Sequence, residues 1–301
     1  MPSPTRSENL RGAGWMTLSM AGYVVNDALI KLTTETIPVF QAIFLRGLVV
    51  VAIFMVAAAR MRLIRDLRSH FGRPLALRVS METVGTVLFL NALTHAPLAG
   101  LTAVLQIVPV AMTFIAARLL RESVSLHRVA SVVVGFVGVL IIIRPGSSDF
   151  NPWLLVGLVV VVGIIIRELA TTRIPVDTPS VIVSLAAAAS ITAVGGIGSL
   201  AEGWSTVSGT NAIRLSAAAC FIAIGYLASV VTVRVGDLSF SAPFRYTIMV
   251  FAIALQIVVF NDVPDALTFA GTALIIAAGL YAFRSETRAA RLVSQPTKLR
   301  F

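Results

Sequence analysis

The strongest constraint on this chain is a succession of long apolar runs, most of them about 17–25 residues, the length that crosses a hydrocarbon core roughly 30 Å thick. Hydrophobic residues make up 57% of the sequence and charged residues 13%, whereas a soluble domain carries about 25% charge. A soluble globular domain and a disordered chain are therefore excluded. The pattern predicts an all-α integral membrane protein with ten transmembrane helices, at residues 14–32, 37–59, 75–94, 98–117, 127–143, 152–170, 179–200, 212–233, 240–260 and 266–283.

The short loops between these runs carry a topology signal. Most of the 24 Lys and Arg residues lie in the loops on the side of the two termini, and only Lys31, Arg144 and Arg214 fall in the loops on the other side. Cytoplasmic loops are enriched in Lys and Arg, so both termini are expected in the cytoplasm, where residues 285–301 form a basic tail. The same placement argues against nucleic acid as a partner.

An internal repeat divides the chain into two halves. A shift of 140 residues places Gly85 on Gly225 and keeps five predicted spans in register, which predicts five-helix repeats at residues 12–144 and 152–284. Because five is an odd number, the two repeats must cross the membrane in opposite directions. Inverted repeats are typical of secondary transporters, whose substrate site lies between the halves. A channel and a membrane enzyme remain alternatives at this point.

Polar residues within the predicted spans are the candidates for function, because a charge at the bilayer centre costs about 2.5–3.5 kcal/mol on insertion scales. Asp27 and Lys31 are four residues apart, so they share a helix face and can pair. Arg46 needs a partner from another helix, and Asp27 and Glu82 are the plausible ones. The nearly balanced charge argues mildly against a strongly ionic substrate. The candidate substrate-binding or gating residues are Asn26, Asp27, Arg46, Glu82, Asn91, Gln106, Pro109, Arg245 and Tyr246.

Other sequence features bear on helix shape and on chemistry. Gln106 with Pro109, and Pro243 further on, predict local breaks at which backbone polar groups are freed. The glycines at 195, 196 and 198 are expected to permit close helix packing. A single cysteine, Cys220, excludes an internal disulfide and a cysteine metal cluster. The motifs of zinc proteases and serine hydrolases are absent from the sequence. We therefore expect neither an enzyme nor a bound metal or cofactor.

The sequence contains a set of short motifs in a fixed order: Asn26-Asp27, Phe44-Leu45-Arg46, Pro97-Leu98-Ala99, Pro109, Glu122 and the run from Ala242 to Tyr246. Together they resemble the drug/metabolite transporter superfamily, in its ten-helix branch of EamA-like carriers. The resemblance covers the chain from about Gly12 to Arg284 and implies two five-helix halves around a cavity that opens alternately to each side. The matching features occur in the order of the family and at the expected spans.

The substrate that this resemblance implies is a small metabolite. Asn26-Asp27 together with the run from Pro243 to Tyr246 is similar to two uptake subgroups, bacterial riboflavin transporters and S-adenosylmethionine transporters. A balanced cavity suits neutral riboflavin, so riboflavin import through the bacterial inner membrane is the expectation. Uptake of S-adenosylmethionine is the alternative, followed by export of amino acids or drugs. The resemblance leaves open whether the carrier acts as a monomer or as a homodimer.

Overall fold

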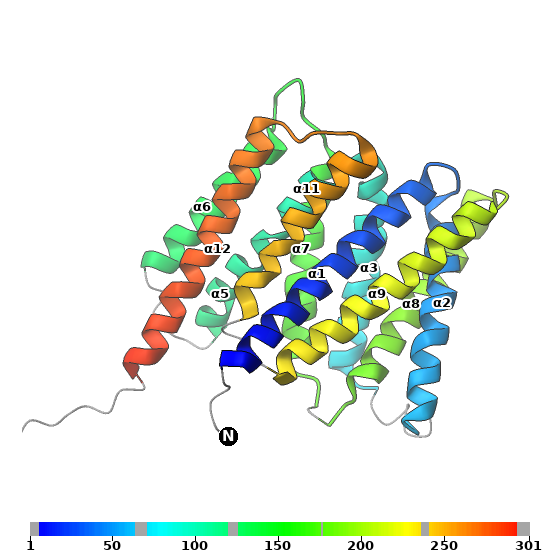
Figure 1. The fold of residues 1–301 in the computed structure, drawn as a ribbon, viewed down its shortest axis with the longest axis horizontal. Coiled ribbons are helices and arrows are strands. Elements are labelled where there is room, and N and C mark those ends of the chain that lie inside the picture. The colour runs from blue at the N-terminus through cyan, green and yellow to red at the C-terminus, as the bar shows by residue number, and fades with distance from the viewer. Residues whose placement is uncertain (1–5, 64–70, 120–125, 176, 236–240, 294–301) are drawn as a thin grey trace, which may run out of the picture.

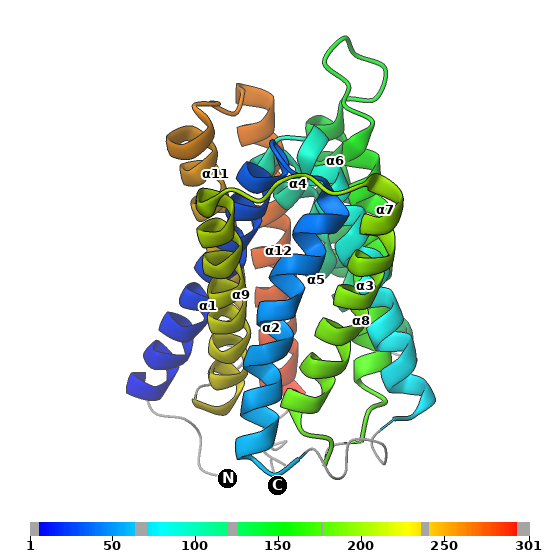
Figure 2. The same ribbon diagram turned by 90° about the vertical axis from the view of Figure 1, so that its right-hand side faces the viewer.

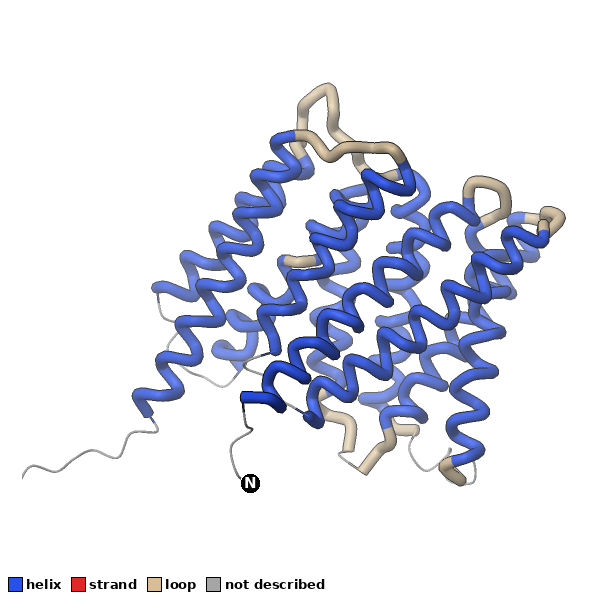
Figure 3. Tube along the Cα trace, in the orientation of Figure 1, coloured by secondary structure: helices blue, strands red, loops and turns tan. Residues whose placement is uncertain are grey.

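The computed structural model describes residues 6–63, 71–119, 126–175, 177–235 and 241–293, which form helices joined by turns and loops (Figure 3). No strand occurs in these ranges. The helices are α1 (Arg6–Thr34), α2 (Val39–Arg60), α3 (Arg73–His95), α4 (Leu98–Leu105), α5 (Ile107–Leu119), α6 (Leu126–Ile143), α7 (Trp153–Thr171), α8 (Ser180–Glu202), α9 (Gly209–Val235), η2 (Ala242–Tyr246), α11 (Thr247–Phe260) and α12 (Ala266–Val293).

The predicted all-α membrane class is confirmed. Among the described residues, six helices are long and apolar enough to cross a bilayer, and three shorter apolar helices accompany them. Each predicted span falls on one helix or on two consecutive helices, but ten membrane crossings stay a prediction. One boundary differs from the sequence expectation, because α12 continues as helix to Val293, into the predicted tail at 285–301.

Two predicted spans are interrupted, at the positions where proline lies in the sequence. The span at 98–117 divides into α4 and α5 at Gln106, whose backbone N–H donates to Ala103 O at 3.0 Å. Pro109 lies in the first turn of α5 and has no N–H to offer the carbonyl of Leu105, so the helix cannot run on unbroken. The span at 240–260 begins as the 3₁₀ helix η2, with Pro243 in its first turn, before α11 starts.

The helices pack mainly in pairs that are distant in sequence. α1 lies along α9, α2 along α8, α3 along α7 and α6 along α12, and the views in Figures 1 and 2 agree on this arrangement. α1 begins and α12 ends at the same end of the bundle, which we call the terminal end (Figure 1). The opposite end carries the loops after α1, α3, α6, α8 and α11 and is called the distal end.

Small residues allow the α1 and α9 backbones to approach closely. A Cβ at Gly22 would lie 2.7 Å from Phe221 O, and one at Gly225 would lie 3.0 Å from the Tyr23 ring. Ser19 Oγ also donates to Gly225 O at 2.7 Å. Such small-residue contacts drive helix association where lipid gives no hydrophobic advantage. The glycines at 195, 196 and 198 pack in the same way against Phe40, Ile43 and Phe44 of α2.

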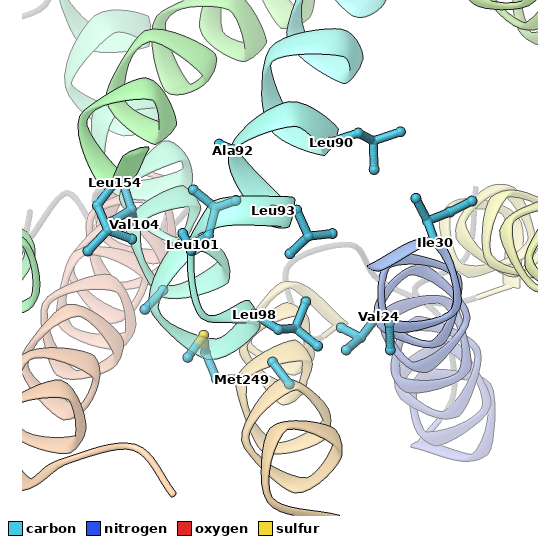
Figure 4. Packing of buried hydrophobic residues seen from close by; sticks show 14 of the residues in the cluster. Val24, Ile30, Leu90, Ala92, Leu93, Leu98, Leu101, Val104, Leu154 and Met249 are labelled. Carbon is cyan, nitrogen blue, oxygen red and sulfur yellow. The ribbon is translucent and has the colours of Figure 1, made fainter. Parts of the chain in front are cut away.

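The apolar core lies toward the distal end. Leu90 and Leu93 of α3 lie on the side of Ile30 of α1, and Leu98 of α4 lies beside Val24 (Figure 4). Residues of α7, α11 and further helices belong to the same cluster. Large apolar side chains also cover the outside of the bundle; Leu200 is 80% exposed and Val258 75% exposed. An apolar exterior is the surface that lipid requires of a membrane-spanning helix.

Arg144 links the distal ends of α6 and α12. Its guanidinium contacts the carboxylate of Asp265, and Asp149 lies 3.7 Å away. Asp265 Oδ1 also accepts the Thr268 backbone N–H at 2.9 Å, an N-capping contact at the start of α12. The hydrogen bond from Arg144, reinforced by those from Thr268, lowers the pKa of Asp265 from 3.8 to about 2.

The glycine contact between α1 and α9 predicts a strong response to added volume. Gly22→Val should lower the melting temperature of the detergent-solubilised protein, because overpacking typically costs about 1–3 kcal/mol and the atoms it meets are backbone. Gly14→Val, on the same helix, is the matched control, since a Cβ at Gly14 meets no heavy atom within 4 Å. Equal melting temperatures for the two variants would show that the contact is loose.

The depressed pKa of Asp265 predicts a pH window for the Arg144 contact. Because the folded-state pKa lies below the ordinary value, the contact stabilises the fold above about pH 4 and is lost as the pH falls toward about pH 2. Asp265→Asn keeps a capping side chain but removes the charge. The melting temperatures of wild type and variant should therefore differ at neutral pH and converge in acid; a constant difference would mean that the charge is not involved.

Candidate functional site

A cavity of about 180 Å³ lies between α1, α2, α3 and α7, with Leu105 of α4 and Ile222 of α9 completing its wall. Leu90 belongs both to this wall and to the apolar core (Figure 4), so the core borders the cavity on its distal side. The polar groups in the wall are concentrated on a few side chains, namely Asn26, Asp27, Arg46, Glu82, Thr86 and Arg167.

Arg46, Asn26 and Asp27 form a hydrogen-bonded chain at the cavity. Arg46 Nη1 donates to Asn26 Oδ1 at 3.0 Å, and Asn26 Nδ2 donates to Asp27 Oδ1 at 2.9 Å. Arg46 is 4% exposed and Asn26 1% exposed. Asp27 was one of two partners expected for Arg46, and it does attract the guanidinium electrostatically, but the Asn26 amide lies between them in the hydrogen-bonded chain.

Two groups in this hydrogen-bonded series can still accept or donate further hydrogen bonds. Arg46 Nε has no hydrogen-bond partner among the described residues. Among the same residues, no Lys or Arg nitrogen forms a salt bridge with Asp27. An unsatisfied buried polar group costs about 1–3 kcal/mol. The cavity therefore offers a cationic donor and an anionic acceptor to whatever enters it.

Glu82, the other partner expected for Arg46, is engaged elsewhere. Arg78 Nη1 lies 2.7 Å from Glu82 Oε2, one helical turn away on α3, and Arg167 Nη1 of α7 lies 3.4 Å from Glu82 Oε1. Arg167 also donates to Glu168 at 2.5 Å. Glu82 and Arg167 thus connect α3 to α7 beside the cavity. Arg167 itself lines the cavity.

The predicted pair between Asp27 and Lys31 does not form. Lys31 Nζ donates to the backbone carbonyls of Leu93, at 2.9 Å, and Ala96, and it lies 5.5 Å from the centroid of the Phe260 ring. Carbonyls at the end of α3 lack partners within their own helix, so they compete successfully for the ammonium group. Lys31 consequently fastens α1 to α3 at the distal end and leaves Asp27 to the cavity.

The remaining predicted residues lie outside the cavity wall. Asn91 follows Leu90 on α3, and Gln106, 8% exposed, caps α4 next to Leu105. Pro109 lies in α5, and Arg245 is exposed on η2. Tyr246 is buried, and its hydroxyl has no partner among the described residues. Their roles in binding or gating stay predictions. Glu122, part of the resemblance, lies outside the described residues.

Sequence reasoning missed the apolar and small residues of the wall. Met81, Gly85, Thr86 and Phe89 line the cavity together with Glu82. Gly85 and Thr86 follow Glu82 by three and four residues and Phe89 follows it by seven, a spacing that places all three on its face of the helix. They were missed because a small or apolar residue in a membrane helix is ordinarily a packing residue.

A second cavity, of about 270 Å³, lies at the distal end around Arg144, Asp149 and Asp265. Its polar groups already bind one another; Gln256, for example, accepts from Ala99 N at 2.6 Å and donates to Asp262 at 3.0 Å. We therefore take the smaller cavity, with its unused donor and acceptor, as the candidate site. No group of three or more potential metal ligands occurs in the described ranges.

Comparisons with known proteins agree with this architecture. The EamA-like transporter family matches residues 10–144. The S-adenosylmethionine uptake transporter of Rickettsia conorii is 25% identical over 93% of this chain and 95% of its own length. The riboflavin transporter of Vibrio cholerae is 26% identical over 94% and 96%.

A solved crystal structure shares the fold. It aligns with a TM-score of 0.61 over 96% of this chain and 99% of the other chain, at 19% identity. The likeness extends over both halves of the bundle, beyond the residues that the family matches. The first half of the chain therefore resembles the EamA-like transporter family, and the two relatives named above are transporters rather than enzymes.

Proposed function

We propose that this transporter is a secondary carrier that imports S-adenosylmethionine across the bacterial inner membrane. The observation that carries the proposal is that the cavity wall brings together Arg46, whose Nε has no hydrogen-bond partner, and Asp27, whose carboxylate forms no direct salt bridge among the described residues. S-adenosylmethionine bears a carboxylate together with a sulfonium and an ammonium group. The cavity thus offers a counter-charge of each sign, as expected of an intramembrane ligand site.

Riboflavin is the second candidate, supported by the relative from Vibrio cholerae. The sequence argument favoured riboflavin because the intramembrane charges seemed to cancel. That argument weakens once Glu82 is engaged by Arg78 and Arg167 while Asp27 keeps no ion pair in the described part of the chain. An acid without a direct ion pair suits a cationic ligand better than a neutral one.

The transport mechanism that we propose is alternating access by two inverted halves, residues 12–144 and 152–284. The helix pairing supports it, because α1 of the first half packs on α9, the third helix of the second, and α3 packs reciprocally on α7. Such reciprocity is the mark of a two-fold arrangement. The first residues of the helices also fit the 140-residue repeat, because α5 and α11 begin 140 residues apart, as do α6 and α12.

Substrate must change the shape of the cavity to be carried. A volume of about 180 Å³ is below the roughly 300–1,000 Å³ of most ligand pockets, so the site widens when it is loaded. The Glu82–Arg167 contact between α3 and α7 borders the cavity and would separate on widening. Substrate then shifts the balance between two states by binding one of them better. Both termini are proposed to be cytoplasmic, as the Lys and Arg distribution indicates.

Uptake into proteoliposomes tests the substrate. Purified protein should accumulate labelled S-adenosylmethionine in a saturable manner, and preloaded unlabelled S-adenosylmethionine should accelerate entry by exchange. Excess riboflavin should compete weakly. Uptake of labelled riboflavin without uptake of S-adenosylmethionine would transfer the proposal to the second candidate, and uptake of neither would refute both.

Asp27→Asn tests the role of the free carboxylate. Loss of the charge should lower kcat/KM for S-adenosylmethionine about tenfold or more, because a hydrogen bond to a charged group contributes about 1.5–3 kcal/mol. Glu35→Gln is the matched control, an exposed acid that follows α1. Protein yield and melting temperature should be measured for both variants. Equal transport by the two would exclude Asp27 from the site.

A further inference from the structure

Gly85 occupies an unusual position for a glycine in a membrane helix. It is buried in α3 and lines the cavity, and a Cβ built on it would meet no heavy atom within 4 Å. Packing between helices therefore does not require glycine here. The missing side chain leaves a notch in the cavity wall.

The corresponding glycine of the second half makes the contrast plain. Gly225, 140 residues further on, faces Tyr23 and Ser19 of α1, and a Cβ there would lie 3.0 Å from the Tyr23 ring and 3.1 Å from Ser19 O. Close helix contact accounts for Gly225. The equivalent residue in the first half opens into empty space instead, which calls for a different explanation.

The notch lies between a charged residue on one side and an aromatic residue on the other. Glu82 precedes Gly85 by three residues and Phe89 follows it by four, so all three lie on one face of α3, and all three line the cavity. The exposed backbone of a glycine lets a flat group approach closely. The Phe89 ring offers a face or edge against which another aromatic ring can pack.

We propose that the notch at Gly85 receives the planar heteroaromatic ring of the substrate, packed against Phe89, and that Gly85 sets the size of ring that the carrier accepts. This inference rests on the proposed function, because it assigns one part of the substrate to one part of that site. The amino-acid portion and the sulfonium then lie toward Arg46 and Asp27, across the cavity on α2 and α1. Adenosyl and flavin groups both carry such a ring.

The test is a graded series, Gly85→Ala and Gly85→Val, assayed for S-adenosylmethionine uptake in proteoliposomes. KM should rise from wild type to Ala to Val, by about tenfold or more for Val, since a methylene-sized change in a binding pocket is worth roughly 10–200-fold. Both variants should melt no lower than wild type, because the added atoms enter open space. Should Val destabilise the fold, the Ala variant carries the test.

Gly163→Ala and Gly163→Val on α7 are the matched controls. Gly163 lies on the helix that packs along α3, and a Cβ there meets only Met81 O, at 3.9 Å, but Gly163 is not part of the cavity wall. These variants should keep the wild-type KM. Phe89→Leu should raise KM in the same direction as Gly85→Val, because it removes the ring.

The outcomes separate this inference from the function on which it rests. An unchanged KM in Gly85→Val, or an equal rise in the Gly163 controls, would overturn the notch while the carrier function stands. A wild-type protein that takes up neither S-adenosylmethionine nor riboflavin would overturn the function, and with it the notch.

Discussion

The hydrocarbon core of the bilayer contains no water to hydrogen-bond a charged group, and the architecture of this protein follows from that constraint. Each charged side chain within the spans must find a partner in the protein or face a cavity. Glu82 meets the constraint through Arg78 and Arg167. Arg46 and Asp27 meet it only in part, through one amide between them. Their incomplete hydrogen bonding is the reason why we propose this cavity as the binding site, whereas the larger distal cavity is lined by groups that already bind one another.

The distal end is held shut around this arrangement. Gln41 exchanges two hydrogen bonds with the backbone of Ser205, at 2.8 and 2.9 Å, and Asn211 donates to Thr36 at 2.8 Å. With the contacts of Lys31 and Arg144, these bonds join the distal ends of the helices above the apolar core. Because the core also borders the cavity on that side, the proposed transport cycle requires these contacts to separate before substrate can pass to the distal end. A carrier that alternates access needs such contacts to be many and individually weak, so that substrate binding can shift the balance.

The helices and their breaks follow from local sequence, which explains why they were predictable. Apolar runs, Pro109 and Pro243 determine the backbone conformation only within a few residues of their own positions. Partners of charged residues were less predictable: Lys31 was expected to pair with Asp27 but bonds the carbonyls of α3, because the end of another helix offers acceptors that no spacing rule reveals. The role of Gly85 in the cavity wall could not be predicted from the sequence for a related reason. The same residue type serves close packing at Gly225 and open space at Gly85, and only the neighbouring helix determines which.

The central claim is that substrate occupies the cavity between α1, α2, α3 and α7, and substrate protection tests it directly. Cys220, which is exposed, would be replaced by serine, and Thr86→Cys would place one thiol in the cavity wall. The measurement is the rate at which a small charged thiol reagent labels that cysteine in detergent-solubilised protein. We expect saturating S-adenosylmethionine to slow the labelling strongly, with half-protection near the KM for uptake. Labelling at the same rate with and without substrate, in a variant that still transports, would contradict the claim.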